Sequence, residues 1–317
     1  MQARRNPGCQ CQFNLQIRDS FMTTKRLIIT GDDYGLCKSV NDAIEECLGA
    51  GAMHATCVMA NMPACAQSAA LRSKFPRASI GLHWNLTQGK PLLSAKEVPT
   101  LVNSAGQFAP LLRRRWLAGQ IERAEIRAEL TAQYGYFRAL AGAPDFWNTH
   151  QNVHVFPGLF QFFVLLGDEL KIPAMRSHER FTVPARGSAL AYELRHPAYW
   201  LKGEVIRRWS RGARARGMRM PDGRLYLPGY QAGRYAPAVP LQRLDWRRVA
   251  AAVELVIHPA KELDTRVFGS LTESRLREYE LFRDPQTAAT LRRAGIALVG
   301  FDALGASGRA AVREQAA

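Results

Sequence analysis

The sequence lacks a hydrophobic segment long enough to cross a membrane. Its longest apolar stretch, residues 155–166, is interrupted by a proline, a glycine and a glutamine, whereas a spanning helix needs about 20 consecutive apolar residues. The first residues also lack the apolar core of a secretory signal, because polar side chains such as Asn6 and Gln10 occupy that region. We therefore predict a cytoplasmic protein without a transmembrane segment.

Cysteine is absent after Cys65. No two of the six cysteines form a C-x-x-C pair, and all lie in the first 65 residues: Cys9, Cys11, Cys37, Cys47, Cys57 and Cys65. A disulfide framework would need partners in the rest of the chain, so this distribution argues against a disulfide-stabilised secreted fold. We predict buried or unreactive thiols, and Cys47 falls on the apolar stripe of a predicted helix.

Acidic residues are scarce relative to basic ones. The 317 residues include 43 Lys and Arg against 27 Asp and Glu, a formal net charge of +16, so polyanions and anionic surfaces have to be considered as partners. Six arginines crowd one short segment: Arg207, Arg208, Arg211, Arg214, Arg216 and Arg219. Because Trp209 is the only aromatic residue among them, we predict a solvated face and no specific nucleic-acid site. The cluster could equally face an anionic sugar or a lipid-linked glycan at the inner membrane surface.

The composition, 47% hydrophobic and 22% charged, is that of a globular enzyme or binding protein. Residues 1–24 are polar and contain a second methionine, Met22, so we predict a disordered extension or a misassigned start. A single domain is predicted over 25–305, with an irregular basic insertion or lid at about 177–244. Residues 306–317 are predicted to form a flexible tail.

Strands and helices alternate along the predicted domain. Residue patterns predict strands at 27–30, 79–82, 145–149, 253–257 and 296–301, and helices at 40–48, 121–140, 159–166 and 273–282. This alternation is typical of α/β proteins with a parallel sheet or barrel.

Four of the predicted strands lead directly into residues that bind metals or transfer protons. The first strand runs into Asp32 and Asp33, and three later ones end at His83, His150 and His258. The carboxyl ends of parallel strands converge on one face of an α/β fold, where ligands and catalytic groups collect. We therefore expect these side chains to form one site.

Each of these features alone has a simpler interpretation. An Asp pair after a strand is most often a turn or a helix N-terminal pair. His150 and His154 have the H-x-x-x-H spacing of divalent-metal sites, but this spacing is only moderately specific. We interpret His54, His178 and His196 as surface or packing histidines.

Four sequence blocks carry a more specific signal. They are RLIITGDDYGL at 26–36 followed by Val40-Asn41, GLHWNLTQGKP at 81–91, NTHQNVHVFP at 148–157, and ELVIHP at 254–259 with REYE at 277–280. In this order the blocks resemble the YdjC-like carbohydrate deacetylases (ChbG/HpnK type), and the resemblance covers about residues 25–305.

The resemblance implies an irregular (βα) barrel of TIM-like type with parallel strands and a metal site at the C-terminal strand ends. It implies a divalent cation held by Asp33, His83 and His150, with Asp32 as general base. His258 would be an acid or a substrate-binding group.

Two positions depart from the family pattern. Asn148 stands where an Asp is usual, and Asn152 stands where a His is usual. Both changes lie close to His150 in the sequence and bear on how this third ligand is oriented. His154 is therefore considered as a further ligand or as a residue that orients the ligands.

The implied activity is metal-dependent removal of an N-acetyl group from an N-acetylglucosamine-containing oligosaccharide or glycolipid, with release of acetate. The cation would be Mg or Zn, because a mixed carboxylate and imidazole site accepts several divalent ions. Two other functions fit the residues: a metal-dependent phosphoesterase, and a basic polyanion-binding protein with a vestigial metal site. The sequence leaves the acceptor sugar and the oligomeric state, including a homodimer, open.

Overall fold

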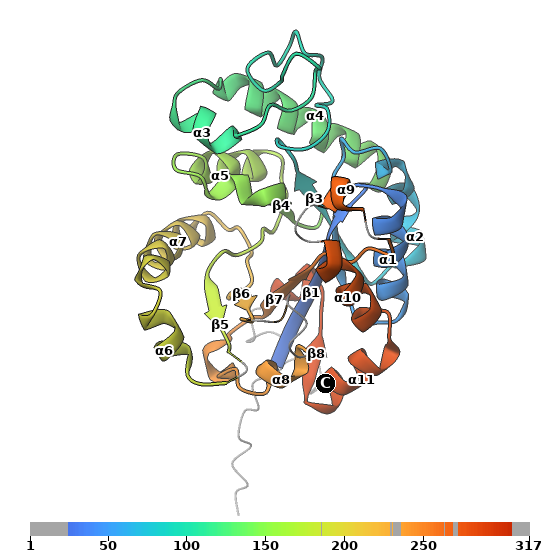
Figure 1. The fold of residues 1–317 in the computed structure, drawn as a ribbon, viewed down its shortest axis with the longest axis vertical. Coiled ribbons are helices and arrows are strands. Elements are labelled where there is room, and N and C mark those ends of the chain that lie inside the picture. The colour runs from blue at the N-terminus through green and yellow to red at the C-terminus, as the bar shows by residue number, and fades with distance from the viewer. Residues whose placement is uncertain are drawn as a thin grey trace, which may run out of the picture.

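The computed structural model describes residues 25–184, 186–228, 230, 236–262, 264–268 and 272–305. Figure 1 shows a central sheet surrounded by helices, with the later helices α10 and α11 beside α1. The predicted extension at 1–24 and tail at 306–317 lie outside the described residues. Within the described part of the chain, no helix is both long enough and apolar enough to cross a membrane.

The elements alternate as predicted. The strands are β1 Lys25–Tyr34, β2 Ala55–Val58, β3 Ser79–Trp84, β4 Trp147–Thr149, β5 Arg180–Thr182, β6 Gly223–Tyr226, β7 Val253–Ile257 and β8 Ile296–Leu298. The helices are α1 Lys38–Gly49, α2 Leu71–Lys74, α3 Leu112–Leu117, α4 Arg123–Ala141, α5 Phe160–Glu169, α6 Ala189–Leu194, α7 Pro197–Ala215, α8 Ala238–Leu241, α9 Thr265–Phe268, α10 Thr272–Phe282 and α11 Pro285–Arg293. Short 3-10 segments include η1 Cys65–Ala70, η2 His150–Val155, η3 Trp246–Arg248 and η5 Phe301–Leu304.

The sheet is parallel in every described strand pairing. Its strand order is β4-β3-β2-β1-β7-β6-β5, and β8 also pairs with β1. Parallel strands need crossover connections, usually helices, and these cover the sheet. The predicted parallel α/β architecture is therefore confirmed, and the sheet curves as the TIM-like class requires.

The segment 173–176 continues the sheet beyond β4. Trp147 of β4 donates its backbone N–H to Ala174, and Met175 in turn donates to Arg219, which leads towards β6. These isolated bridges extend the pairing from β4 to the residues that precede β6. The result is an irregular barrel, because regular strand pairing is lost at this closing segment.

The barrel interior is filled by alternate residues of the strands. A small apolar cluster contains Ile28, Ala55, Cys57, Phe146, Ala174, Ala252 and Phe301. Gly81 leaves room for this packing, since a Cβ there would lie 2.6 Å from the Phe146 ring. Because side chains alternate along a strand, the residues two and four positions further on also face inward, at the carboxyl end.

Two features of the fold differ from the sequence-based expectation. β1 extends to Tyr34 and β3 to Trp84, so Asp32, Asp33 and His83 lie within strands and do not follow them. The segment 177–244, predicted as an irregular insertion, contributes β5 and β6 to the sheet. Short strands of three and four residues give too little apolar alternation to be recognised among the many arginines.

Candidate metal centre and active site

Strand alternation brings the predicted residues to one end of the barrel. On β1, Ile28 is interior, and Thr30 and Asp32 follow it on the same face. The same period of two takes β3 from Gly81 to His83, and takes the chain from Phe146 through β4 to His150. The carboxyl ends of these neighbouring strands therefore carry acidic and imidazole side chains into a common space.

Asp33 would face the helices if β1 stayed regular. Its backbone φ is +71°, and the pairing of β1 with β2 shifts register between Gly31 and Tyr34. Such an irregularity redirects a side chain, and Asp tolerates the left-handed conformation better than most residues. Two consecutive carboxylates thus both reach the site.

Asp33, His83 and His150 form a compact group of buried donor atoms. Asp33 Oδ1 lies 3.2 Å from His83 Nε2 and 3.1 Å from His150 Nδ1. Arg275 donates to the other oxygen, Oδ2, at 2.5 Å. Burial raises the pKa of Asp33, but the charges of His150 and Arg275 outweigh it and hold this pKa well below its usual range.

These three residues could hold a metal ion, since their ligand atoms all lie within 4.8 Å of one another. Donors that each lie about 2.1 Å from one cation are themselves separated by about 3.0–3.4 Å, which matches the two distances from Asp33 Oδ1. One carboxylate and two imidazoles suit Zn and several other divalent ions. The donor set therefore fits a single divalent cation.

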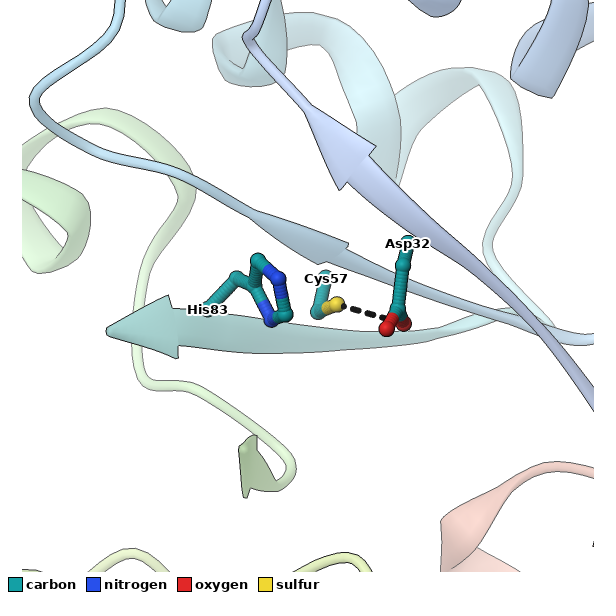
Figure 2. A group of neighbouring side chains, drawn as sticks. All are labelled: Asp32, Cys57 and His83. Atoms are coloured by element: carbon teal, nitrogen blue, oxygen red, sulfur yellow. Dashed lines mark hydrogen bonds between the residues drawn. The ribbon is translucent and has the colours of Figure 1, made fainter. Parts of the chain in front are cut away.

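A second group, Asp32, Cys57 and His83, lies side by side on the first three strands (Figure 2). Cys57 Sγ is 3.1 Å from Asp32 Oδ1 and donates to it. Burial, followed by the charge of Asp32, raises the pKa of the Cys57 thiol well above its usual value. Because only a thiolate is a good metal ligand, this group is a poorer cation site than the first.

Asp32 is held in a buried ionic cluster. Arg176 donates to its two oxygens at 2.6 and 2.7 Å, and also donates to Glu254 Oε1 at 2.8 Å. Burial alone would raise the pKa of Asp32, but the charge and hydrogen bonds of Arg176 lower it below its usual range. Asp32 therefore stays ionised at neutral pH, and its carboxylate is fixed in orientation.

His258 follows β7 and faces Asp32. Its Nε2 lies 3.9 Å from Asp32 Oδ2, and its backbone N–H donates to Glu278 Oε2 at 2.6 Å. Burial lowers the pKa of His258 to about 4, although Asp33 and Asp32 oppose the shift. The ring is therefore neutral at pH 7 and carries one N–H and one free lone pair.

Glu278 gives a pH-dependent stability that can be measured. Burial raises its pKa from 4.5 to about 7. Between these values the folded protein keeps a proton that the unfolded chain releases, so the free energy of unfolding falls as pH rises and stays lower above pH 7, by about 3 kcal/mol. We expect Glu278→Gln, which cannot ionise, to be more stable than the natural protein near pH 8 and almost equally stable near pH 4, as measured by urea denaturation with chelator present. Lower stability of the variant at both pH values would contradict this.

Most of these groups line one cavity of about 820 Å³, within the size range of small-molecule sites. Its walls include Asp32, Asp33, His83, His150 and His258, together with Arg176, Arg224, Tyr226, Tyr230 and Arg275. The five candidate site residues named from the strand ends and the four sequence blocks are thus brought together. The cavity lies at the carboxyl edge of the sheet.

Four residues of the site were given no role from the sequence, although two of them fall in the fourth sequence block: Arg176, Glu254, Arg275 and Glu278. Glu254 carried a usable signal, because a carboxylate within the otherwise apolar strand VELVI has to find a buried partner. Arg176 and Arg275 carried none, since a buried arginine looks the same in the sequence as the many exposed ones.

Comparison with known proteins agrees with the four sequence blocks. The profile of the family described as YdjC-like protein matches residues 26–293. The chain belongs to the YdjC-like family. The predicted family membership is therefore confirmed.

Curated relatives of this YdjC-like chain are named as deacetylases. It is 26% identical over 275 residues to a carbohydrate deacetylase from Geobacillus stearothermophilus, covering 86% of this chain and 96% of that protein. It is 37% identical over 137 residues to a chitooligosaccharide deacetylase from Serratia marcescens, covering 43% of this chain and 53% of that protein. A chitooligosaccharide deacetylase from Yersinia enterocolitica is 33% identical over 150 residues, or 47% of this chain and 58% of its own length. The chain thus spans nearly all of the first relative and just over half of the other two.

A solved structure supports the fold. A protein from Enterococcus faecalis V583, whose name suggests cleavage of cellobiose phosphate, aligns with a TM-score of 0.68 over 89% of this chain and 99% of its own. The sequence identity is 24%, so the likeness concerns the fold alone.

His154, considered as a further ligand, lies apart from the Asp33 group. Its Nδ1 is 2.7 Å from the Thr149 hydroxyl, and its ring centroid is 4.5 Å from that of His178. Burial lowers the pKa of His154 to about 3. The kink at Gln151 and Asn152, both with positive φ, separates the two histidines of the H-x-x-x-H spacing. This geometry favours His150 over His154 as the third ligand.

Asn148, one of the two departures named in the sequence analysis, lies between His83 and Arg176. In one orientation of its amide, the oxygen lies 2.5 Å from His83 Nδ1 and accepts its hydrogen, so Nε2 keeps a free lone pair towards Asp33. In the other orientation, the oxygen accepts from Arg176 at 2.7 and 3.0 Å, and the NH2 group donates to His83 Nδ1. That second arrangement places the His83 hydrogen on Nε2, where it opposes cation binding. One amide cannot satisfy both neighbours, whereas a carboxylate can.

Asn148→Asp is therefore expected to bind divalent ions about 10-fold more tightly, because residues that orient metal ligands affect affinity by about 10–100-fold. Titration calorimetry of the metal-free protein with Zn²⁺ and Mg²⁺ measures this directly. Asn148→Ala serves as the matched control and should bind more weakly than the natural protein. Equal or weaker binding by Asn148→Asp would show that the amide does not limit His83.

Proposed function

We propose that this protein is a metal-dependent carbohydrate N-deacetylase that removes the acetyl group from an N-acetylated amino sugar and releases acetate. The observation that carries the proposal is the position of the ionised Asp32 beside the Asp33, His83 and His150 group in one cavity. The deacetylase names of the YdjC-like relatives agree with this chemistry.

Asp33, His83 and His150 would hold the divalent cation. When bound, the cation would polarise the acetyl carbonyl and lower the pKa of a nearby water. Arg275 keeps Asp33 Oδ2 engaged, so that Oδ1 remains directed at both histidines. The group is rigid because all three side chains are buried or nearly so.

Asp32 is proposed as the general base. It accepts a proton from the water that attacks the acetyl carbonyl carbon. Arg176 makes Asp32 a weak base in isolation, since it lowers the pKa of this carboxyl, but it also fixes the carboxylate at one position. Proton transfer is then efficient only from a water that has itself been made acidic.

His258 is proposed as the general acid that donates a proton to the leaving nitrogen. Its Nε2 lies beside Asp32, and its ring is neutral at pH 7. A proton passed to His258 can be delivered to the amide nitrogen as the C–N bond breaks. The products are acetate and the free amino sugar, and no proton is gained or lost overall at the site.

Acetate release tests this function. The purified protein would be assayed with N-acetylglucosamine oligomers, N-acetylated glycolipids and phosphoesters, with chelator or with added Zn²⁺ or Mg²⁺. We expect acetate from one class of N-acetylated sugar, loss with chelator and recovery with one of the ions. Phosphate release without acetate would identify a phosphoesterase and overturn the proposal. Release of neither product by protein that has a metal bound would also overturn it.

A further inference from the structure

Helices α6 and α7 lie on the outer side of β5 and β6 (Figure 1), and both carry large apolar side chains that are exposed to solvent. Five such residues are between 42% and 72% exposed: Leu190, Leu194, Trp200, Leu201 and Val205. With the neighbouring exposed residues Arg195, Arg208 and Arg211, they make up the α6–α7 face. Isolated exposed apolar residues are ordinary, but five of them on two helices that contact each other indicate an interaction surface.

The orientation of α7 is fixed by its opposite side. Ile206, Ser210 and Ala213 are buried, and Trp209 stacks on Phe160 of α5 with ring centroids 5.1 Å apart. One side of α7 therefore packs against the protein core. The apolar residues of the α6–α7 face lie on the other side and take no part in that packing.

The charges around the α6–α7 face are strongly unbalanced. Residues 195–216 include seven basic side chains and one acidic one, Glu204. The arginine cluster of this segment is not one surface, because Arg214 turns inward to pair with Glu179 and Arg207 pairs with Glu204. Arg208 and Arg211 stay exposed and form no ion pair among the described residues. Arg208 lies two turns, about 10 Å, beyond Leu201 on the same side of α7.

We propose that the α6–α7 face docks on an anionic lipid bilayer. An interfacial helix buries Trp and Leu side chains at the level of the lipid headgroups, while arginines bind the phosphates above them. The α6–α7 face combines both elements, with its apolar residues on α6 and the first half of α7 and its unpaired arginines further along. A nucleic acid would match the charge but would leave the apolar side chains unpartnered.

Docking would bring the cavity close to the bilayer. Tyr192 of α6 has its hydroxyl 3.3 Å from that of Tyr226, and Tyr226 lines the cavity. The α6–α7 face therefore adjoins the wall of the candidate active site. The docking itself does not depend on which reaction the site performs.

Vesicle flotation tests the proposal without any activity measurement. The full chain would be mixed with vesicles of phosphatidylcholine alone, or with about one third phosphatidylglycerol, at low and high salt. We expect binding only to the anionic vesicles and weakening with salt. Trp200→Glu with Leu201→Glu, and separately Arg208→Glu with Arg211→Glu, should each weaken binding about 10-fold or more.

Matched controls distinguish the effect of the α6–α7 face on vesicle binding from the effect of the protein's net charge. Arg77→Glu with Lys96→Glu makes the same charge change at two exposed residues elsewhere, and Leu117→Glu changes a leucine of α3 that is 58% exposed. Both should retain vesicle binding, and thermal melts confirm that every variant is folded. Equal loss in the controls, or no binding to anionic vesicles, would overturn the proposal. A self-association that only the α6–α7 variants abolish, without vesicle binding, would instead identify the face as a contact between copies of the chain.

Discussion

Asp32→Asn is expected to lower the rate of acetate release by roughly 10²–10⁴-fold, the usual contribution of a general base, while divalent ions still bind. Asparagine keeps the shape of the side chain but cannot accept a proton from water. Asp32 does not belong to the group of Asp33, His83 and His150, so its replacement leaves those three donors in place. Acetate assays and calorimetric metal titration on the same preparation separate the two effects.

A buried substitution needs a check on folding. In Asp32→Asn, Arg176 loses a charged partner but keeps Glu254, so a thermal melt must show that the variant is folded. Asp168→Asn, which changes an exposed carboxylate on α5, is the matched control and should behave like the natural protein. Retained turnover in Asp32→Asn would exclude Asp32 as the base.

His83→Ala is expected to abolish both metal binding and acetate release. It removes one of three donor atoms from the Asp33 group, and loss of a direct ligand should weaken binding by roughly 100-fold or more, beyond the effect of residues that only orient ligands. Activity should fall with the bound metal. The same calorimetric titration measures the affinity, and chelated natural protein gives the background rate.

Three further variants identify which group holds the ion. His150→Ala should behave like His83→Ala, because His150 Nδ1 also lies near Asp33 Oδ1. Cys57→Ser should keep the ion, since the thiol donates to Asp32 and is not needed as a ligand. His154→Ala should keep it as well, provided that the variant is folded. Loss of the ion in Cys57→Ser with retention in His150→Ala would assign it to the second group, with Asp32.

Most strands could be predicted from the sequence, but only some of their ends could. β7 matches its predicted range 253–257, because an apolar run before His258-Pro259 leaves few alternatives. β1 extends four residues beyond its predicted end, since Asp32 and Asp33 are buried by partners from distant parts of the chain. β2 was missed because the four residues ATCV carry little pattern of their own.

The sequence by itself determined the parallel α/β class, the family and the residues that are candidates for the site. These follow from local periodicity and from motifs whose residues are close together along the chain. Tertiary structure alone decided that Arg176 fixes Asp32, that Arg275 engages one oxygen of Asp33, and that His150 joins the group while His154 does not. The reason is that pairings such as Arg275 with Asp33, 242 residues apart, and a single left-handed φ at Asp33 leave no trace in local periodicity. Burial inside the curved sheet then makes each of these contacts strong.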